Sequence, residues 1–187
     1  MYELDVLGKP ILKYSRIVGR AEILIWRRIK MDSNAVTKSK TIFTPARNVD
    51  PAAIPWVPLG EGKSFKPLRF FKDDRGFAEL LRIEPGTVIP LHRHTGEIHA
   101  FNLEGTRELC TGEMIGPGDY VYEPEGNVDT WKVVGDVPCV IFVTVGGAVE
   151  FLGADNSVER SVSGATLQDL YREYCAANGL ETIDLID

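Results

Sequence analysis

Cysteine is scarce in this chain of 187 residues. The three cysteines, Cys110, Cys139 and Cys175, lie far apart and form no CxxC pair. An odd and widely spaced set argues against a disulfide framework, so we expect reduced thiols and a cytoplasmic location. Cys139 and Cys175 lie in apolar-periodic segments, where a cysteine usually packs as a small core residue rather than acting as a nucleophile.

No apolar run is long enough to cross a bilayer. The most apolar stretch near the start, residues 23–26, is short and continues into Arg27 and Arg28, which is not the layout of a signal peptide. Positive charge is not in excess either, because 21 Lys and Arg residues oppose 27 Asp and Glu residues and give a net charge of −6. Since phosphate binding needs a basic surface, neither nucleic acid nor a membrane is expected as a partner.

The composition suits one domain, with 44% hydrophobic and 26% charged residues. Residues 1–30 are basic and irregular, and residues 32–40 read as a polar connector. We therefore expect an N-terminal arm over residues 1–40, either disordered or packed against a second subunit, and a single domain over residues 41–187. Met31 is an alternative biological start of the chain.

From residue 41 onward the chain has the pattern of short strands. Runs rich in Val, Ile, Phe, Tyr and Trp alternate with turn residues, among them Pro85-Gly86, Pro117-Gly118 and Pro124-Glu125-Gly126. Many short strands with regular turns predict an all-β sandwich or barrel. The expected strands cover residues 41–44, 65–71, 77–84, 98–103, 120–123, 128–134, 139–145 and 149–152.

The end of the chain differs, because residues 166–178 have helical periodicity. Leu167, Leu170, Tyr171 and Tyr174 form one apolar stripe, which we expect to pack on the outside of the barrel. Thr166 can cap the start of this helix, with Asp169 three residues later, and Gly179 can end it.

All three histidines of the chain lie within eight residues. His92 and His94 are two apart, so on a strand both imidazoles leave the same face. After the turn at residues 95–96, Glu97, His99 and Phe101 share one face, and we expect that face to point inward because the alternate residues are more polar. Imidazoles that converge on one point suit Zn, Fe, Mn, Ni or Cu.

A second segment supplies a carboxylate. Strand alternation puts Asp129, Trp131 and Val133 on one face and Lys132 on the other. Lysine on the outside predicts that Asp129 and Trp131 lie inside. A buried aspartate is costly unless it is paired or bound to a metal ion. Asp129 is therefore a candidate metal ligand, and the alternative is a carboxylate that accepts backbone N–H groups.

These residues belong to two spaced motifs. Gly86-x5-His92-x-His94-x4-His99-x5-Gly105 resembles the first cupin motif, whose usual form is G-x5-H-x-H-x3,4-E-x6-G. The usual glutamate position holds His99. Glu97 is a competing carboxylate two residues earlier, either a ligand, a partner of a ligand or a general base.

The second motif is Gly118-x5-Pro124-x-Gly126-x2-Asp129, which resembles the cupin form G-x5-P-x-G-x2-H-x3-N with aspartate in place of histidine. The resemblance implies a double-stranded β-helix, that is a jelly-roll cupin barrel, with an N-terminal arm and a C-terminal helix, and a homodimer. It also implies one divalent metal ion, and the implied ligands are His92, His94, His99 and Asp129.

Within the cupins, residues 92–99 and 122–127 are similar to the 2,4′-dihydroxyacetophenone dioxygenase group and the related acetylacetone dioxygenases. This similarity implies a non-haem dioxygenase, with Fe(II) favoured over Zn, Mn or Ni, that uses O₂ to cleave a C–C bond in a small ketone or diketone. Glu97 would be the catalytic base, and Phe101 and Trp131 would line the substrate pocket.

Two alternatives remain open. One is a metal-binding cupin without catalysis, like the zinc-binding cupin domain of anti-sigma factors. The other is a metal-dependent isomerase, which requires a basic residue in the pocket. No lysine or fourth histidine is evident in the pocket, which disfavours the isomerase, and we expect Arg82, Arg93 and Arg107 on the surface.

Overall fold

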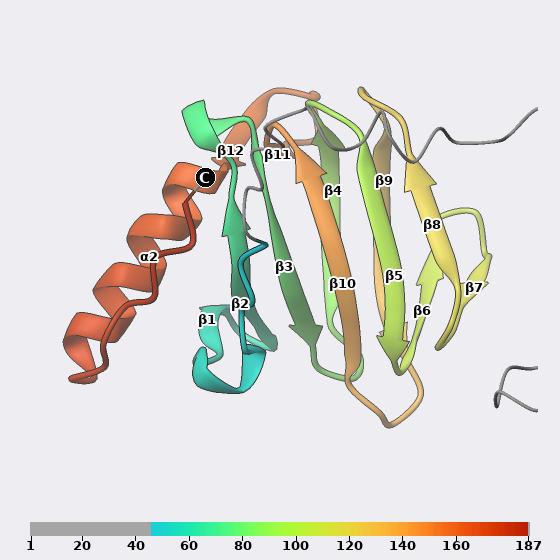
Figure 1. The fold of residues 1–187 in the computed structure, drawn as a ribbon. Coiled ribbons are helices and arrows are strands. Elements are labelled where there is room, and N and C mark those ends of the chain that lie inside the picture. The colour runs from blue at the N-terminus through green and yellow to red at the C-terminus, as the bar shows by residue number, and fades with distance from the viewer. Residues whose placement is uncertain (1–45, 187) are drawn as a thin grey trace, which may run out of the picture. The chain divides into compact units, whose positions relative to one another are not determined.

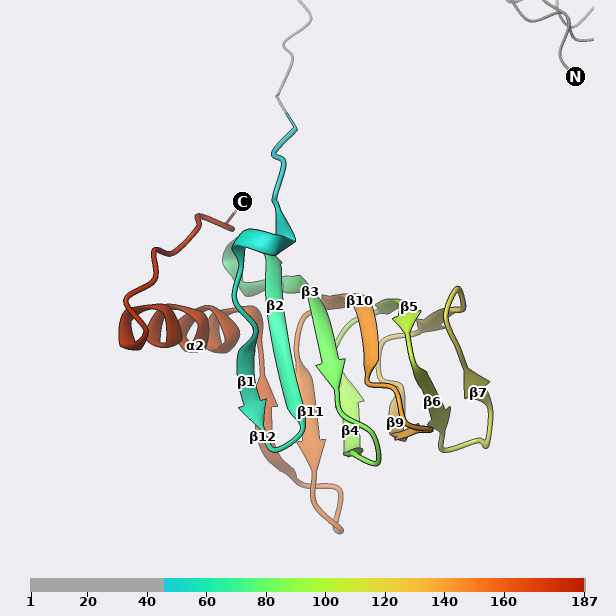
Figure 2. The ribbon, with the colours of Figure 1, turned by 90° about the horizontal axis from the view of Figure 1, so that it is seen from below.

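The computed structural model of this chain describes residues 46–186, so the expected N-terminal arm and the expected strand at residues 41–44 lie outside the described part. Two antiparallel sheets of six strands each face one another, and Figure 2 shows them as two layers. The single described α-helix, α2 (Gly164–Ala177), lies beside β1 and β2 at one side of the layers (Figure 1). The all-β jelly-roll expected from the sequence is confirmed.

The first sheet has the order β1-β2-β3-β10-β5-β8 and the second the order β12-β11-β4-β9-β6-β7. Strands of the first sheet are β1 (Val57–Gly60), β2 (Lys63–Phe70), β3 (Gly76–Ile83), β10 (Cys139–Gly146), β5 (Ile98–Glu104) and β8 (Tyr120–Glu123). Strands of the second sheet are β12 (Val158–Val162), β11 (Val149–Leu152), β4 (Val88–His94), β9 (Val128–Val134), β6 (Thr106–Leu109) and β7 (Met114–Ile115). Two short 3₁₀ helices, η1 (Pro51–Ala53) and η2 (Lys72–Asp74), precede β1 and β3.

Seven of the eight expected strands are present within two residues of their expected ends. The structure adds β1, β4, β6, β7 and β12. These were missed because β4 contains Pro90 and three basic or imidazole side chains, β12 is mostly polar, and the others are only two to four residues long. Short or polar strands therefore lack a clear sequence pattern, and they form because neighbouring strands of the sheet pair with them.

The core lies between the two sheets and follows the two-residue period of the strands. In β10, Cys139, Ile141, Val143 and Val145 are buried and alternate with residues that are not. This strand pairs with β3 on one side and β5 on the other. Each fully buried side chain of this size contributes about 1.5–3 kcal/mol of hydrophobic stabilisation, so the centre of the first sheet anchors the barrel.

Strand β5 presents the face opposite to the one expected from the sequence. Ile98, Ala100 and Asn102 are buried, whereas Phe101 and Leu103 are each 42% exposed. The expectation that the face containing residues 97, 99 and 101 points inward is therefore wrong. That expectation assumed that Asn102, as a polar residue, faces outward, whereas Asn102 is buried.

Asn102 is buried because its amide is fully used at the tight turn after β5. Its Nδ2 group donates to the carbonyls of Glu104 at 3.2 Å and Gly105 at 2.9 Å, and its Oδ1 accepts from the Cys139 thiol at 3.4 Å. Gly105 has a φ of 63°, which glycine adopts without the penalty of a Cβ atom. A satisfied polar side chain thus costs little inside the barrel.

Helix α2 begins three residues earlier than a start capped by Thr166 would require. Ser163 is the N-cap: its hydroxyl accepts from the Thr166 N–H, and the Thr166 hydroxyl accepts from the Ser163 N–H at 2.7 Å, which is a capping box. The buried stripe is Gly164, Leu167, Tyr171 and Cys175. Leu170, expected in this stripe, is 40% exposed.

Tyr171 ties the C-terminal segment to this helix. Its hydroxyl accepts from the Ile183 N–H at 2.9 Å, and further along the buried Leu185 accepts through its carbonyl from the Phe70 N–H at 2.8 Å. Among the described residues, no helix is both long and apolar enough to cross a membrane.

We predict that Asn102→Ala destabilises the barrel by about 2 kcal/mol, because it removes the side-chain donor of the Glu104 and Gly105 carbonyls and the acceptor of the buried Cys139 thiol. Chemical denaturation followed by circular dichroism measures the difference. Leu103→Ala, at the exposed neighbouring position, is the matched control and is expected to leave the unfolding midpoint nearly unchanged. Equal midpoints for the two variants would contradict this account of Asn102.

Candidate functional site

The candidate site starts from two histidines on β4, the strand that pairs with β9 on one side and β11 on the other. His92 and His94 are both buried, and their rings lie 4.8 Å apart at 85°. Their two-residue spacing therefore places both imidazoles on the inner face of the second sheet, as the sequence predicts.

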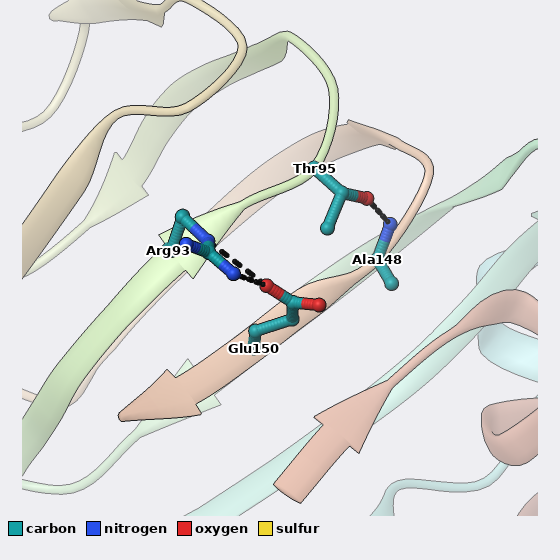
Figure 3. Close-up of polar contacts among 4 residues, drawn as sticks. All are labelled: Arg93, Thr95, Ala148 and Glu150. Atoms are coloured by element: carbon teal, nitrogen blue, oxygen red, sulfur yellow. Dashed lines mark hydrogen bonds and ion pairs between the residues drawn. The ribbon is translucent and has the colours of Figure 1, made fainter. Parts of the chain in front are cut away.

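The intervening residue, Arg93, belongs to the outer face and helps to hold the register of β4. Its Nε and Nη2 groups donate to Glu150 Oε2 on β11 at 2.9 Å and 2.6 Å (Figure 3). Just beyond the strand, the Thr95 hydroxyl accepts from the Ala148 N–H at 2.8 Å. A slip of one residue in this pairing would turn both histidines outward.

His92 is oriented as a neutral imidazole. Its Nδ1 lies 2.8 Å from the Pro90 carbonyl, which can only accept, so Nδ1 carries the proton and Nε2 keeps its lone pair. Burial, together with the neighbouring His94, lowers the pKa of His92, although the Pro90 carbonyl and the carboxylates of Glu123 and Asp129 oppose this. A neutral imidazole held by a backbone carbonyl is the usual form of a metal-ligating histidine.

The carboxylate nearest to these rings is Glu123, at the end of β8, which the sequence analysis did not single out. Its Oε2 lies 2.9 Å from His94 Nε2 and accepts from the Asn127 side-chain amide at 2.9 Å. Burial raises the pKa of Glu123, but the contacts with His94 and Asn127 and the charge of Arg107 outweigh it and hold the pKa below its usual value. Glu123 is therefore an ionised carboxylate inside the barrel.

The register of β5 explains why Glu123 occupies this place. The cupin motif has three or four residues between its second histidine and its glutamate, and the structure shows that the position after three, Ile98, is the inward one. Ile98 lies directly opposite Glu123 in the pairing of β5 with β8. The carboxylate that residue 98 lacks thus comes from its cross-strand partner. The two-residue alternation of β8 places Glu123 on the same face as Val121, and this pattern is the sequence signal that indicates an inward Glu123.

The contact between His94 Nε2 and Glu123 Oε2 is close, at 2.9 Å, and His94 Nδ1 is buried without a hydrogen-bond partner. Two ligands of one metal ion, each bound at about 2.0–2.2 Å, lie roughly 3 Å apart, so this separation suits a shared ion. Within residues 46–186, no three His, Cys, Asp or Glu side chains are already grouped around a single metal position. The donor chemistry nevertheless fits a divalent cation, because it combines the imidazoles of His92 and His94 with the ionised carboxylate of Glu123.

Asp129 lies opposite His92 in the pairing of β9 with β4, and it is buried on the inner face with Trp131, as expected. Its Oδ1 accepts from the Thr130 N–H at 2.7 Å, and it is not among the residues that line the cavity. The observed hydrogen bond is the backbone alternative stated above. Metal ligation by Asp129 stays a prediction.

His99 and Glu97 are not brought to this cluster. The His99 side chain is 42% exposed, with Nδ1 2.5 Å from the Tyr120 hydroxyl and Nε2 3.5 Å from Glu97 Oε1. Glu97 is 61% exposed, and Phe101 shares the outer face of β5. The expected inward placement of all three is wrong, because Ile98 and Ala100 take the inner positions.

A cavity of about 130 Å³ lies between the sheets and reaches His92 and His94. Its walls are mostly apolar and include Trp131, which the sequence placed in the pocket. Besides the histidines, five ionisable side chains line it: Lys63 from β2, Glu79 from β3, Arg107 from β6, Glu123 from β8 and Arg160 from β12. Arg107, expected at the surface, is only 3% exposed.

The inward position of Glu79 could be predicted from the sequence, whereas that of Arg107 could not. Glu79 alternates with Phe77 and Leu81 in β3, which indicates an inward side chain. Arg107 lies in a four-residue strand, too short for alternation to define a face.

Glu79 predicts a specific pH dependence. Complete burial raises its pKa from 4.5 to about 8, so the folded protein keeps the proton over a range in which the unfolded chain releases it. The free energy of unfolding should therefore fall as the pH rises from about 4.5 to 8, by about 1.4 kcal/mol per pH unit from this group. In chelator-treated protein, Glu79→Gln should flatten this slope in denaturation curves, whereas the exposed Glu84→Gln should not. Identical slopes for Glu79→Gln and the unmodified chain would refute the assignment.

Comparisons of the whole chain with proteins of known structure give the same architecture. An RmlC-like cupin protein from Ralstonia eutropha JMP134 superposes with a TM-score of 0.72 at 22% identity, over 76% of this chain and 95% of the other. An acetylacetone dioxygenase from Acinetobacter johnsonii superposes with a TM-score of 0.60 at 16% identity, over 72% of this chain and 95% of the other. At these identities the likeness establishes the fold alone.

A second protein from R. eutropha JMP134, of unknown function and with a cupin-like fold, superposes with a TM-score of 0.68 at 20% identity, over 78% of this chain and 96% of the other. No curated protein sequence matches the chain. The model of the ChrR Cupin-like domain matches residues 45–149, which contain both motifs and the whole histidine and carboxylate cluster. The chain therefore belongs to the ChrR Cupin-like domain family, and the cupin resemblance of its two motifs is confirmed.

Proposed function

We propose that this chain binds one divalent metal ion, preferably Fe(II), on His92, His94 and Glu123 and acts as a dioxygenase on a small ketone or diketone. The observation that carries the proposal is the convergence of two buried imidazoles and one ionised carboxylate at the wall of a cavity. Two histidines and one carboxylate with open coordination positions are typical of non-haem Fe(II) oxygenases. His99 lies on the outer face, so it does not fill one of those positions.

The residues around the cavity have separate roles in this proposal. Its apolar walls, with Trp131, would hold and desolvate a small organic substrate beside the metal position. Glu79, protonated at neutral pH, replaces Glu97 as the candidate general acid–base, because it lines the cavity and Glu97 does not. A bound Fe(II) would supply Lewis acidity and reactivity towards O₂.

A second candidate is a metal-binding cupin without catalysis. The match to the ChrR Cupin-like domain fits this candidate as well, in line with the resemblance to the cupin domain of anti-sigma factors. Asp129 would favour it by closing the site as a fourth ligand, because four protein ligands leave fewer positions for substrate and O₂. The cavity lining also fits a metal-dependent isomerase, because Arg107, Lys63 and Arg160 supply the basic residues that such an enzyme requires.

Metal content and oxygen uptake separate these candidates. The full chain is purified without oxygen, its metals are measured by elemental analysis, and oxygen consumption is followed after addition of acetylacetone and of 2,4′-dihydroxyacetophenone. Bound iron with substrate-dependent oxygen uptake supports the dioxygenase. Tight stoichiometric zinc, with no uptake after replacement by iron, overturns it in favour of the metal-binding module.

The metal site itself predicts the behaviour of single variants. His92→Ala and His94→Ala should each reduce the bound metal at least about tenfold, because no neighbouring group replaces a lost imidazole. His99→Ala is the matched control, a histidine of the same segment on the outer face, and should keep its metal. Circular dichroism verifies that all three retain the β fold. Full occupancy in His92→Ala or His94→Ala is incompatible with the assignment.

The two buried carboxylates can be ranked in the same assay. We expect Glu123→Gln to lower metal affinity more than Asp129→Asn, because Glu123 contacts His94 whereas Asp129 accepts a backbone N–H group. Titration with Zn²⁺ against a competing chelator gives both affinities. The reverse order would make Asp129 the carboxylate ligand and assign Glu123 to the support of His94.

A further inference from the structure

Arg107 is a buried cation whose hydrogen-bonding groups are not all used. It lines the cavity from β6, and its guanidinium carbon lies 5.0 Å from the centroid of the Trp131 ring. Its Nε and Nη2 groups are buried and have no hydrogen-bond partner. Buried charged donors without a partner are costly, so their presence in a cavity wall points to a ligand that accepts from them.

The other charges around the cavity indicate the sign of this ligand. Arg107 interacts electrostatically with Glu123 and Asp129, the two buried carboxylates beside the histidines. If the proposed divalent ion is bound, its two positive charges offset these two carboxylates. Arg107 then contributes a buried positive charge that these carboxylates do not compensate, and Lys63 and Arg160, which also line the cavity, are positive as well. A negatively charged ligand is therefore favoured over a neutral ketone at Arg107.

We propose that Arg107, stacked on Trp131, is a binding subsite for the carboxylate of a small and otherwise apolar substrate. The planar guanidinium can donate two parallel hydrogen bonds to a carboxylate, and the cation–π contact holds its plane in place. The substrate class is accordingly a keto acid or another monocarboxylate with an apolar body. The expected negative charge of the ligand rests on the proposed function, because it assumes a bound divalent ion. The position of the subsite rests on the buried Nε and Nη2 groups of Arg107, which lack hydrogen-bond partners.

The competing explanation is that Arg107 serves only as a counter-ion to Glu123 and Asp129. Benzoate and its neutral isostere benzamide separate the two roles, because they share an apolar ring and differ in charge. Calorimetric titration of the full chain, zinc-loaded to avoid redox chemistry, gives the affinity of each probe. We expect benzoate to bind at least about tenfold more tightly than benzamide.

Three variants complete the test. Arg107→Gln should abolish the preference for benzoate, and Arg107→Lys should retain part of it, since the charge remains but the planar fork is lost. Arg82→Gln, which removes an exposed arginine paired with Glu84 at 2.7 Å, should bind as the unmodified chain does. Circular dichroism verifies folding. Equal affinity for the two probes, or unchanged benzoate binding in Arg107→Gln, overturns the inference.

Repeating the titration after chelator treatment keeps the two proposals apart. Benzoate binding that depends on Arg107, in a chain that elemental analysis shows to have retained no zinc before the chelator was added, would support the subsite and overturn the metal proposal. Metal retention combined with benzoate binding that ignores Arg107 would support the metal proposal and overturn the subsite, because the anion would then bind the ion itself.

Discussion

The pairing of β4 with both of its neighbours is the constraint on which the site depends. Residues of this strand alternate between the interior and the outer face, so a single register decides whether His92 and His94 face the cavity. The ion pair between Arg93 and Glu150 on the outer face supports the register that the histidines need on the inner one. A surface contact of modest energy thereby contributes to the arrangement of buried imidazoles.

The interior chemistry combines few charges with much apolar surface. Glu79 lies among apolar side chains and keeps its proton, whereas Glu123 lies beside His94, Asn127 and Arg107 and loses it. Two glutamates in one cavity thus have opposite protonation states at neutral pH, because their neighbours differ. Such a separation is consistent with the proposal that Glu79 transfers a proton and Glu123 binds a cation.

Much of the fold was predictable because its signals are local. The two-residue periods of β9 and β10 and the Pro-Gly turns are visible in the sequence, and so is the spacing of His92 and His94. The face of β5 was not predictable from polarity, because Asn102 is buried with its hydrogen bonds satisfied by a turn and by Cys139. Glu123 and Arg107 join the site through cross-strand pairing between distant segments, which no single window of sequence contains.

The close contact between His94 and Glu123 joins two different sheets. β4 is an inner strand of one sheet, and β8 is the last strand of the other, held on a single side by β5. An ion bound by both side chains would act as a cross-link between the layers at the place where the first sheet ends. The binding free energy of the ion would then oppose separation of β8 from the second sheet. Loss of the metal would therefore make local opening of the barrel at β8 easier.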